Sequence, residues 1–199
     1  MMFLGNENFF GAKGRAMSGY LHNISMLVVD DCNFTRRVSV RILECFGARN
    51  VREALDGDDA IDQVIAQKPD IVLTDWVMLP RSGLYFTHWA RTGRDTPDPY
   101  LPIIMMSSYS DLSRVREARD AGVNEFLVKP MAPVDLMRRI QSIIEKPRPF
   151  IRDDDYFGPD RRRRMMAFSG EDRRFDRNAV TLSGVHKTAR SKSASISFE

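Results

Sequence analysis

The chain has 199 residues, of which 43% are hydrophobic, and this suits one domain of ordinary size with extensions. Its net charge of +3 is uneven, because residues 23–146 contain 16 basic and 18 acidic side chains, whereas residues 147–199 contain 12 basic and 8 acidic ones. The basic surplus therefore belongs to the C-terminal part, and residues 23–146 give no sign of a nucleic-acid surface.

Export and membrane insertion are not expected from this sequence. No apolar run approaches the roughly 20 residues that span a bilayer, and the first residues contain glycines and polar residues where an export signal needs an apolar stretch. Cys32 and Cys45 do not form a CxxC pair, so no disulfide framework is predicted. Cys32 is either an ordinary packed residue beside a strand end or a reactive thiol. We expect an intracellular, cytoplasmic protein without a membrane partner.

Short apolar runs alternate with amphipathic segments from residue 24 to residue 146. In chain order, we predict a strand at 24–29, a helix at 34–46, a strand at 50–54, a helix at 58–67, a strand at 71–74, a helix at 84–91, a strand at 103–106, a helix at 111–121, a strand at 126–128 and a helix at 133–144. The first helix is predicted from the helical spacing of its apolar residues, and Gly47 is its expected stop. These apolar residues are Phe34, Val38, Ile42, Cys45 and Phe46.

Five successive strand–helix units predict the α/β class, with a doubly wound parallel sheet covered by helices on both faces. Residues 24–146 form this domain, and residues 1–23 and 147–199 are predicted to be flexible N- and C-terminal extensions. The C-terminal extension loses apolar periodicity and is rich in Ser, Arg and Lys. Residual order is considered only near residues 156–159.

Four of the five predicted strands end in polar side chains. Asp30 and Asp31 follow the first strand, Asp75 follows the third, Ser107 the fourth and Lys129 the fifth. A single strand-end aspartate is often only a turn former or a helix cap. In open α/β sheets, however, ligands bind at the carboxyl ends of the strands. Five such groups in register therefore predict one crevice in which they converge.

The residue types in this crevice indicate phosphoryl-transfer chemistry. Three carboxylates repel one another, and Mg²⁺ counters that repulsion well because it binds carboxylate, water and phosphate oxygens. A lysine can contact a phosphoryl oxygen, and a short hydroxyl can donate a hydrogen bond to another. The nucleophile would be a carboxylate, and Asp75 occupies the central position.

The segments LVVDD, DIVLTD, IIMMSS and GVNEFLVKP, with the turn at Gly83, resemble the receiver domain of two-component response regulators, the fold of the bacterial chemotaxis regulator. The resemblance covers residues 25–144 and implies a flavodoxin-like sheet of strand order 2-1-3-4-5. It implies a phosphorelay protein, not an enzyme in the usual sense, that takes a phosphoryl group from a histidine kinase or phosphotransfer protein. Its phosphorylated form would bind a downstream protein through the helix 4–strand 5–helix 5 face.

The resemblance also implies how the acidic pocket works. Asp75 would be the phosphoacceptor, and Asp31 would bind Mg²⁺ directly. Asp30 would bind the ion through water or support it from behind. The backbone carbonyl of Val77 would supply a further protein ligand, so the apolar side chain at this position is no obstacle.

Three further residues have implied roles in catalysis and switching. Ser107 matches the switch hydroxyl, and Lys129 matches the lysine that contacts the phosphoryl group. Phe126 matches the switch aromatic, although a phenylalanine on a buried strand can equally be a core residue. The Lys129–Pro130 bond is similar to one that is usually cis in this family.

The loop after the acceptor departs from the family pattern. Proline comes one place late in Met78-Leu79-Pro80, and Ser82 stands where an acidic residue is common. Two bulky or apolar residues, Val77 and Tyr109, occupy positions that control water access in this family. We therefore expect slow loss of the phosphoryl group from Asp75.

The basic run Arg161–Arg164 admits three interpretations: a solvated segment, a contact for an acidic protein, or a nonspecific contact with nucleic-acid backbone. Residues 150–199 contain too few apolar residues for a helix-turn-helix, so a DNA-binding output domain is not expected. Two alternatives to a terminal switch stay open. One is a receiver-fold scaffold that is never phosphorylated and works through its basic tail, and the other is a relay intermediate.

Overall fold

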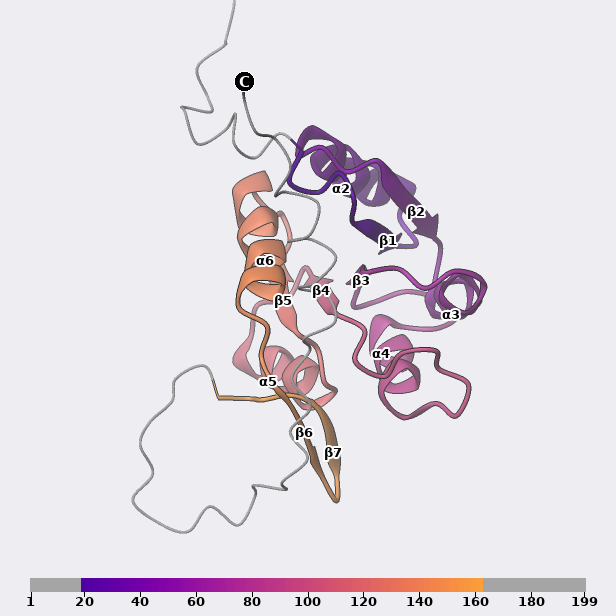
Figure 1. The fold of residues 1–199 in the computed structure, drawn as a ribbon, viewed down its shortest axis with the longest axis vertical. Helices are drawn as coiled ribbons and strands as arrows, with labels where there is room; N and C mark the ends of the chain where they lie inside the picture. Colours follow the sequence, from indigo (N-terminus) through magenta and orange to yellow (C-terminus); the bar gives the residue numbers. More distant parts are fainter. Residues whose placement is uncertain (1–18, 163–199) are drawn as a thin grey trace, which may run out of the picture.

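The computed structural model describes residues 19–162 and contains a five-stranded parallel sheet (Figure 1). Its strands are β1 (Ser25–Val29), β2 (Asn50–Ala54), β3 (Ile71–Asp75), β4 (Ile103–Ser107) and β5 (Glu125–Val128). They are ordered β2-β1-β3-β4-β5, and every neighbouring pair is parallel. The predicted fold class and strand order are confirmed.

Helices cover both faces of this sheet, as alternating strands and helices require. They are α2 (Asn33–Cys45), α3 (Gly57–Ala66), α4 (Gly83–Thr92), α5 (Leu112–Asp120) and α6 (Pro133–Glu145). One core contains buried residues of α2 and α6, and the other contains buried residues of α3, α4 and α5. Successive β1 residues alternate between the two cores, because adjacent side chains of a strand point to opposite faces.

The α2 helix is confirmed, but its predicted apolar face is only partly right, since Phe46 is buried and Ile42 packs on the core while Cys45 is exposed. Phe34 is 76% exposed and Val38 is 40% exposed, whereas the buried face contains Arg36, Ser39 and Leu43. Ser39 is compatible with burial because its hydroxyl donates to the carbonyl of a residue one turn earlier. Arg36 is compatible with burial because its guanidinium finds polar partners beneath the helix, which are described below. Apolar spacing alone therefore identified the helix but missed the polar residues Arg36 and Ser39 on its buried side.

The turn before α4 is fixed by two residues that also shape the site. Ser82 caps the helix, since its hydroxyl accepts a hydrogen bond from the backbone N–H of Tyr85. Gly83 lies so close to β3 that a Cβ atom there would stand 2.1 Å from the carbonyl oxygen of Asp75. Only glycine fits this approach, because any side chain would displace the strand end. Serine at residue 82 is thus a helix cap in place of the acidic residue common in the family.

An antiparallel hairpin follows α6 and corrects the expectation of a flexible tail from residue 147. It is formed by β6 (Phe150–Asp153) and β7 (Tyr156–Pro159), and Figure 1 shows it projecting beyond α5. The order considered near residues 156–159 is therefore part of a paired strand. Four-residue strands give too short a pattern for apolar periodicity to reveal them. Residues 1–18 and 163–199 lie outside the described residues, as do Arg163 and Arg164.

Aromatic packing holds the hairpin on the domain. The rings of Tyr100, Phe150 and Phe157 lie 5.0–5.6 Å apart between centroids in edge-on or tilted pairs. Such pairs stabilise beyond the area they bury. The backbone of β7 also lies against Gly122, where an added Cβ would stand 3.0 Å from the Phe157 carbonyl oxygen. The hairpin is therefore part of the folded domain.

A buried arginine joins the hairpin to the sheet. The guanidinium of Arg91 lies 5.2 Å from the ring centroid of Phe150. It donates hydrogen bonds to the carbonyls of Gly122 and Pro99 and to the side-chain oxygen of Asn124. Burial lowers the pKa of Arg91 to about 10, which leaves it charged at neutral pH. Arg91 thus supplies hydrogen bonds to backbone carbonyls that precede β4 and β5.

Within residues 19–162, no helix combines the length and the apolar character that crossing a bilayer requires.

We predict that Phe150→Ala lowers the free energy of unfolding by about 3 kcal/mol, because it removes a buried aromatic side chain and leaves a cavity. Urea denaturation of the full chain measures this change. The control is Phe34→Ala on exposed α2 surface, for which a change within about 0.5 kcal/mol is expected. Equal effects of the two substitutions would show that the hairpin does not pack on the domain.

Candidate functional site

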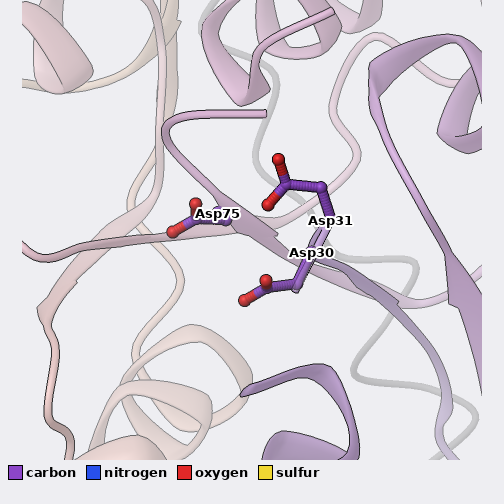
Figure 2. A group of neighbouring side chains, drawn as sticks. All are labelled: Asp30, Asp31 and Asp75. Carbon is purple, nitrogen blue, oxygen red and sulfur yellow. The ribbon is translucent and has the colours of Figure 1, made fainter. Parts of the chain in front are cut away.

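The carboxyl ends of β1 and β3 bring three aspartates together. Carboxylate oxygens of Asp30, Asp31 and Asp75 all lie within 4.8 Å of one another, and Figure 2 shows them facing a common point. Asp30 is only 1% exposed and Asp75 is 9% exposed, whereas Asp31 is open to solvent. β1 and β3 are neighbours in the sheet, so the parallel topology alone places these strand ends side by side.

Lys129, which follows β5, reaches across the sheet end to two of these carboxylates. Its Nζ lies 2.7 Å from Asp30 Oδ2 and 2.6 Å from Asp75 Oδ1. Burial lowers the pKa of Lys129, but its hydrogen bonds and charge interactions with the two carboxylates outweigh burial and raise it overall. The lysine is therefore held in its charged form between the two acids.

Burial is the largest influence on Asp75 and raises its pKa above the ordinary value. The bond and charge of Lys129 act in the opposite direction, and the negative charge of Asp30 raises the pKa further. Because the folded-state pKa is raised, Asp75 supports folding most below its ordinary pKa, and this support is lost as pH rises through the raised value. A divalent cation beside it would favour the ionised, nucleophilic form.

Asp30 is held by groups of its own loop. Its Oδ1 accepts hydrogen bonds from the backbone N–H of Cys32, at 2.9 Å, and from the Thr35 hydroxyl, at 2.7 Å. With Lys129 on Oδ2, both oxygens have fixed partners. Asp30 therefore supports the cluster from behind, while exposed Asp31 is better placed to bind an ion from solvent.

The two predicted switch residues lie on β4, the neighbour of β3, and on β5, the next strand along the sheet. Ser107 ends β4, is buried, and its Oγ accepts a hydrogen bond of 3.0 Å from the backbone N–H of Tyr109. Phe126 in β5 is partly buried and packs edge-on against Trp76, with ring centroids 6.3 Å apart. It is thus in contact with the core, and its role as a switch stays a prediction.

A match to a family model decides to which protein family this chain belongs. The model of the response regulator receiver domain matches residues 26–141, which is more than half of the chain. The chain belongs to the response regulator receiver family. It is therefore a two-component response regulator, and receivers are signalling proteins that bind Mg²⁺ in an acidic pocket.

Chemotaxis regulators are among its similar proteins. This receiver is 31% identical over 124 residues to chemotaxis protein CheY-3 of Vibrio cholerae, across 62% of this chain and 94% of that protein. It is 31% identical over 123 residues to chemotaxis protein CheY of Pseudomonas aeruginosa, across 62% and 98%. A crystal structure of a putative response regulator from Chloroflexus aurantiacus matches with a TM-score of 0.57 and 28% identity, across 62% and 98%.

The donor set of this receiver fits Mg²⁺. All three clustered side chains offer hard carboxylate oxygens, and no His or Cys belongs to the cluster that they form. Asp30, Asp31 and Asp75 would hold the ion, directly or through water. The carbonyl of Val77 stays a predicted ligand, and its side chain is exposed, as a backbone role allows.

Arg36 supports the acidic loop and was missed by the sequence prediction. Its Nη1 donates to the backbone carbonyl of Asp30 at 2.8 Å, and its Nε pairs with Glu53 at 2.8 Å. Its Nη2 donates to the side chain of Asn33 at 3.1 Å. A planar guanidinium can satisfy these partners at once. The apolar spacing of α2 gave no signal for this role, because Arg36 is not among the residues that define the predicted apolar face.

Two prolines near the site follow cis peptide bonds, and Cys32 beside the site is open to solvent. The Leu79–Pro80 and Lys129–Pro130 peptide bonds are both cis, and the second confirms the prediction. Cys32 is exposed, so the alternative of a packed cysteine is wrong. Hydrogen bonds from the Thr35 and Phe34 backbone lower the pKa of its thiol.

We predict that Mg²⁺ raises the melting temperature of this receiver, since an ion that binds only the folded state stabilises it by mass action. Asp31→Asn should remove most of the Mg²⁺-dependent rise, because it removes the exposed carboxylate of the cluster. Differential scanning calorimetry with and without Mg²⁺ measures the effect. Asp62→Asn, an exposed acid on α3, is the control and should keep the full rise. Equal loss in both variants would contradict a specific ion site.

Proposed function

We propose that Asp75 of this receiver accepts a phosphoryl group from the phosphohistidine of a histidine kinase or phosphotransfer protein. The observation that carries the proposal is the bridge of Lys129 to both Asp30 and Asp75 beside a third carboxylate. An ion pair that spans two strand ends places one mobile positive charge where a phosphoryl group on Asp75 would need it.

The chemical step is a substitution at phosphorus. An oxygen of the ionised Asp75 carboxylate attacks, the new P–O bond forms, and the P–N bond to the donor histidine breaks. The leaving imidazole nitrogen keeps the electron pair and takes up a proton. Bound Mg²⁺ would offset the negative charge of the carboxylates and phosphoryl oxygens. Lys129 turns from Asp75 Oδ1 to a phosphoryl oxygen while it keeps its bond to Asp30.

Phosphorylation would then be converted into a change of surface. The phosphoryl group adds negative charge and acceptor oxygens, and the Ser107 hydroxyl moves toward them. Phe126 turns into the space that this movement opens. The surface of α5, β5 and α6, which is the helix 4–strand 5–helix 5 face of the family, changes as a result. Phosphorylation thus shifts the receiver between two conformations.

The composition of that surface supports a protein partner. Leu112 at the start of α5 is 73% exposed, and Val128 and Val134 are also exposed at the end of β5 and the start of α6. Apolar side chains that gather on neighbouring elements favour docking of another protein. The downstream effector is therefore proposed to bind the α5–β5–α6 face.

We predict that a phosphohistidine-bearing phosphotransfer domain labels the wild-type chain with ³²P in the presence of Mg²⁺. Asp75→Asn should abolish the label, because the amide oxygen is a poor nucleophile. Asp62→Asn should be labelled like the wild type. If Asp75→Asn leaves both the label and the downstream response unchanged, while truncation after residue 162 removes the response, a scaffold that works through its tail replaces this proposal.

A second prediction concerns the lifetime of the label. Val77 and Tyr109 are bulky or apolar and both are exposed beside the site, where they can restrict water. The purified, phosphorylated chain should therefore keep its label for minutes or longer with Mg²⁺. Tyr109→Ala should shorten this lifetime. The lifetime is measured by removing the donor and counting the acid-stable label that remains bound to the protein. Loss within seconds from the wild type would contradict this expectation.

A further inference from the structure

A cation lies between two aromatic rings beside the acceptor. The guanidinium of Arg114, on α5, lies 5.2 Å from the ring centroid of Trp76 and 4.7 Å from that of Tyr109. Both distances are within the roughly 6 Å over which a cation is attracted to a ring face. One side chain of α5 thus connects two loops that are separate in the sequence.

The first of these rings is fixed next to the phosphoacceptor. Trp76 follows Asp75 directly and is buried, and its backbone N–H donates to the Met106 carbonyl at 2.8 Å. Its ring also packs edge-on against Phe126. Trp76 is therefore a rigid support, because both its backbone and its ring have partners in the core.

The second ring belongs to the loop that follows Ser107, the predicted switch serine. Tyr109 is exposed, and its backbone N–H donates to Ser107 Oγ at 3.0 Å. Arg114 therefore attaches an otherwise solvent-facing tyrosine to the rigid Trp76. The backbone of Tyr109 in turn holds the Ser107 hydroxyl. Two interactions define what we call the paired arrangement. They are the hydrogen bond from the Tyr109 backbone N–H to Ser107 Oγ and the ion pair between Lys129 and Asp75.

We propose that Arg114 is a positioning residue that stabilises the paired arrangement and so weakens the binding of a phosphoryl group at Asp75. This inference rests on the proposed function. Movement of Ser107 toward a phosphoryl oxygen lengthens its bond with Tyr109 and displaces the loop. The stack of Tyr109 on Arg114 opposes that displacement, since a contact made in only one of two arrangements shifts the population toward it.

The charge of Arg114 predicts the opposite effect, and this makes the inference testable. A positive charge near an anionic ligand would strengthen binding through simple attraction. If the stack dominates, removal of Arg114 tightens binding of a phosphoryl analogue; if the charge dominates, removal weakens it. Arg116 is exposed on the same helix and serves as the control for charge.

The experiment is a titration of the full chain with beryllofluoride, an analogue of the phosphoryl group, at constant Mg²⁺. The chain has two tryptophans, so Trp89→Phe leaves Trp76 as the only fluorescent indole. In this background, Arg114→Ala should lower the titration midpoint about 3- to 10-fold, as expected for the loss of one or two partly exposed cation–π contacts. Arg116→Ala should stay within about 2-fold of its parent.

A double-mutant cycle tests whether Arg114 acts through Tyr109. In a Tyr109→Ala background, Arg114→Ala should shift the midpoint less than it does with tyrosine present. An unchanged or higher midpoint in the single variant overturns the inference, as does an undiminished shift in the Tyr109→Ala background. Melting temperatures verify that each variant is folded.

Failure of the proposed function would look different from failure of this inference. A parent chain that shows neither a fluorescence change nor a higher melting temperature with beryllofluoride and Mg²⁺ lacks the acceptor site, and both proposals then fall. A parent chain that responds, with Arg114→Ala equal to it, leaves the acceptor function standing and refutes only the role of Arg114.

Discussion

The ammonium of Lys129 between Asp30 and Asp75 is the interaction on which this receiver depends. Two carboxylates with almost no access to solvent would repel each other, and burial already raises the pKa of Asp75. Lys129 makes their proximity tolerable and comes from a strand two places away from β3. The order of the sheet, the close approach of Gly83 and the buttress of Arg36 all serve to keep this triangle of charges in place.

The arrangement of Lys129, Asp30 and Asp75 also makes the site sensitive to added charge. Burial disfavours the ionised form of Asp75, so a positive charge placed beside it, such as a bound divalent cation, would favour ionisation. The lysine can change partners without leaving the crevice, because Asp30 holds it from the other side. A site of this kind responds to small changes of charge with a change of contacts.

Sequence was sufficient where local chemistry decides the structure, and insufficient where distant partners decide it. The strand-end positions of Asp30, Asp75 and Lys129 followed from apolar runs and were confirmed. The burial of Arg36 in α2 did not follow, since it depends on Glu53, which lies on the strand β2. The hairpin did not follow either, because its packing depends on Tyr100, a residue that is distant in the sequence.

The position of the hairpin also has a consequence for assembly. It packs on Tyr100 and Gly122, which precede β4 and β5, whereas Asp75 lies at the opposite, carboxyl end of its strand. The hairpin therefore lies at the end of the sheet away from the crevice. A protein that bound the hairpin would thus leave the approach to Asp75 open, so the two ends of the sheet could contact different molecules at the same time.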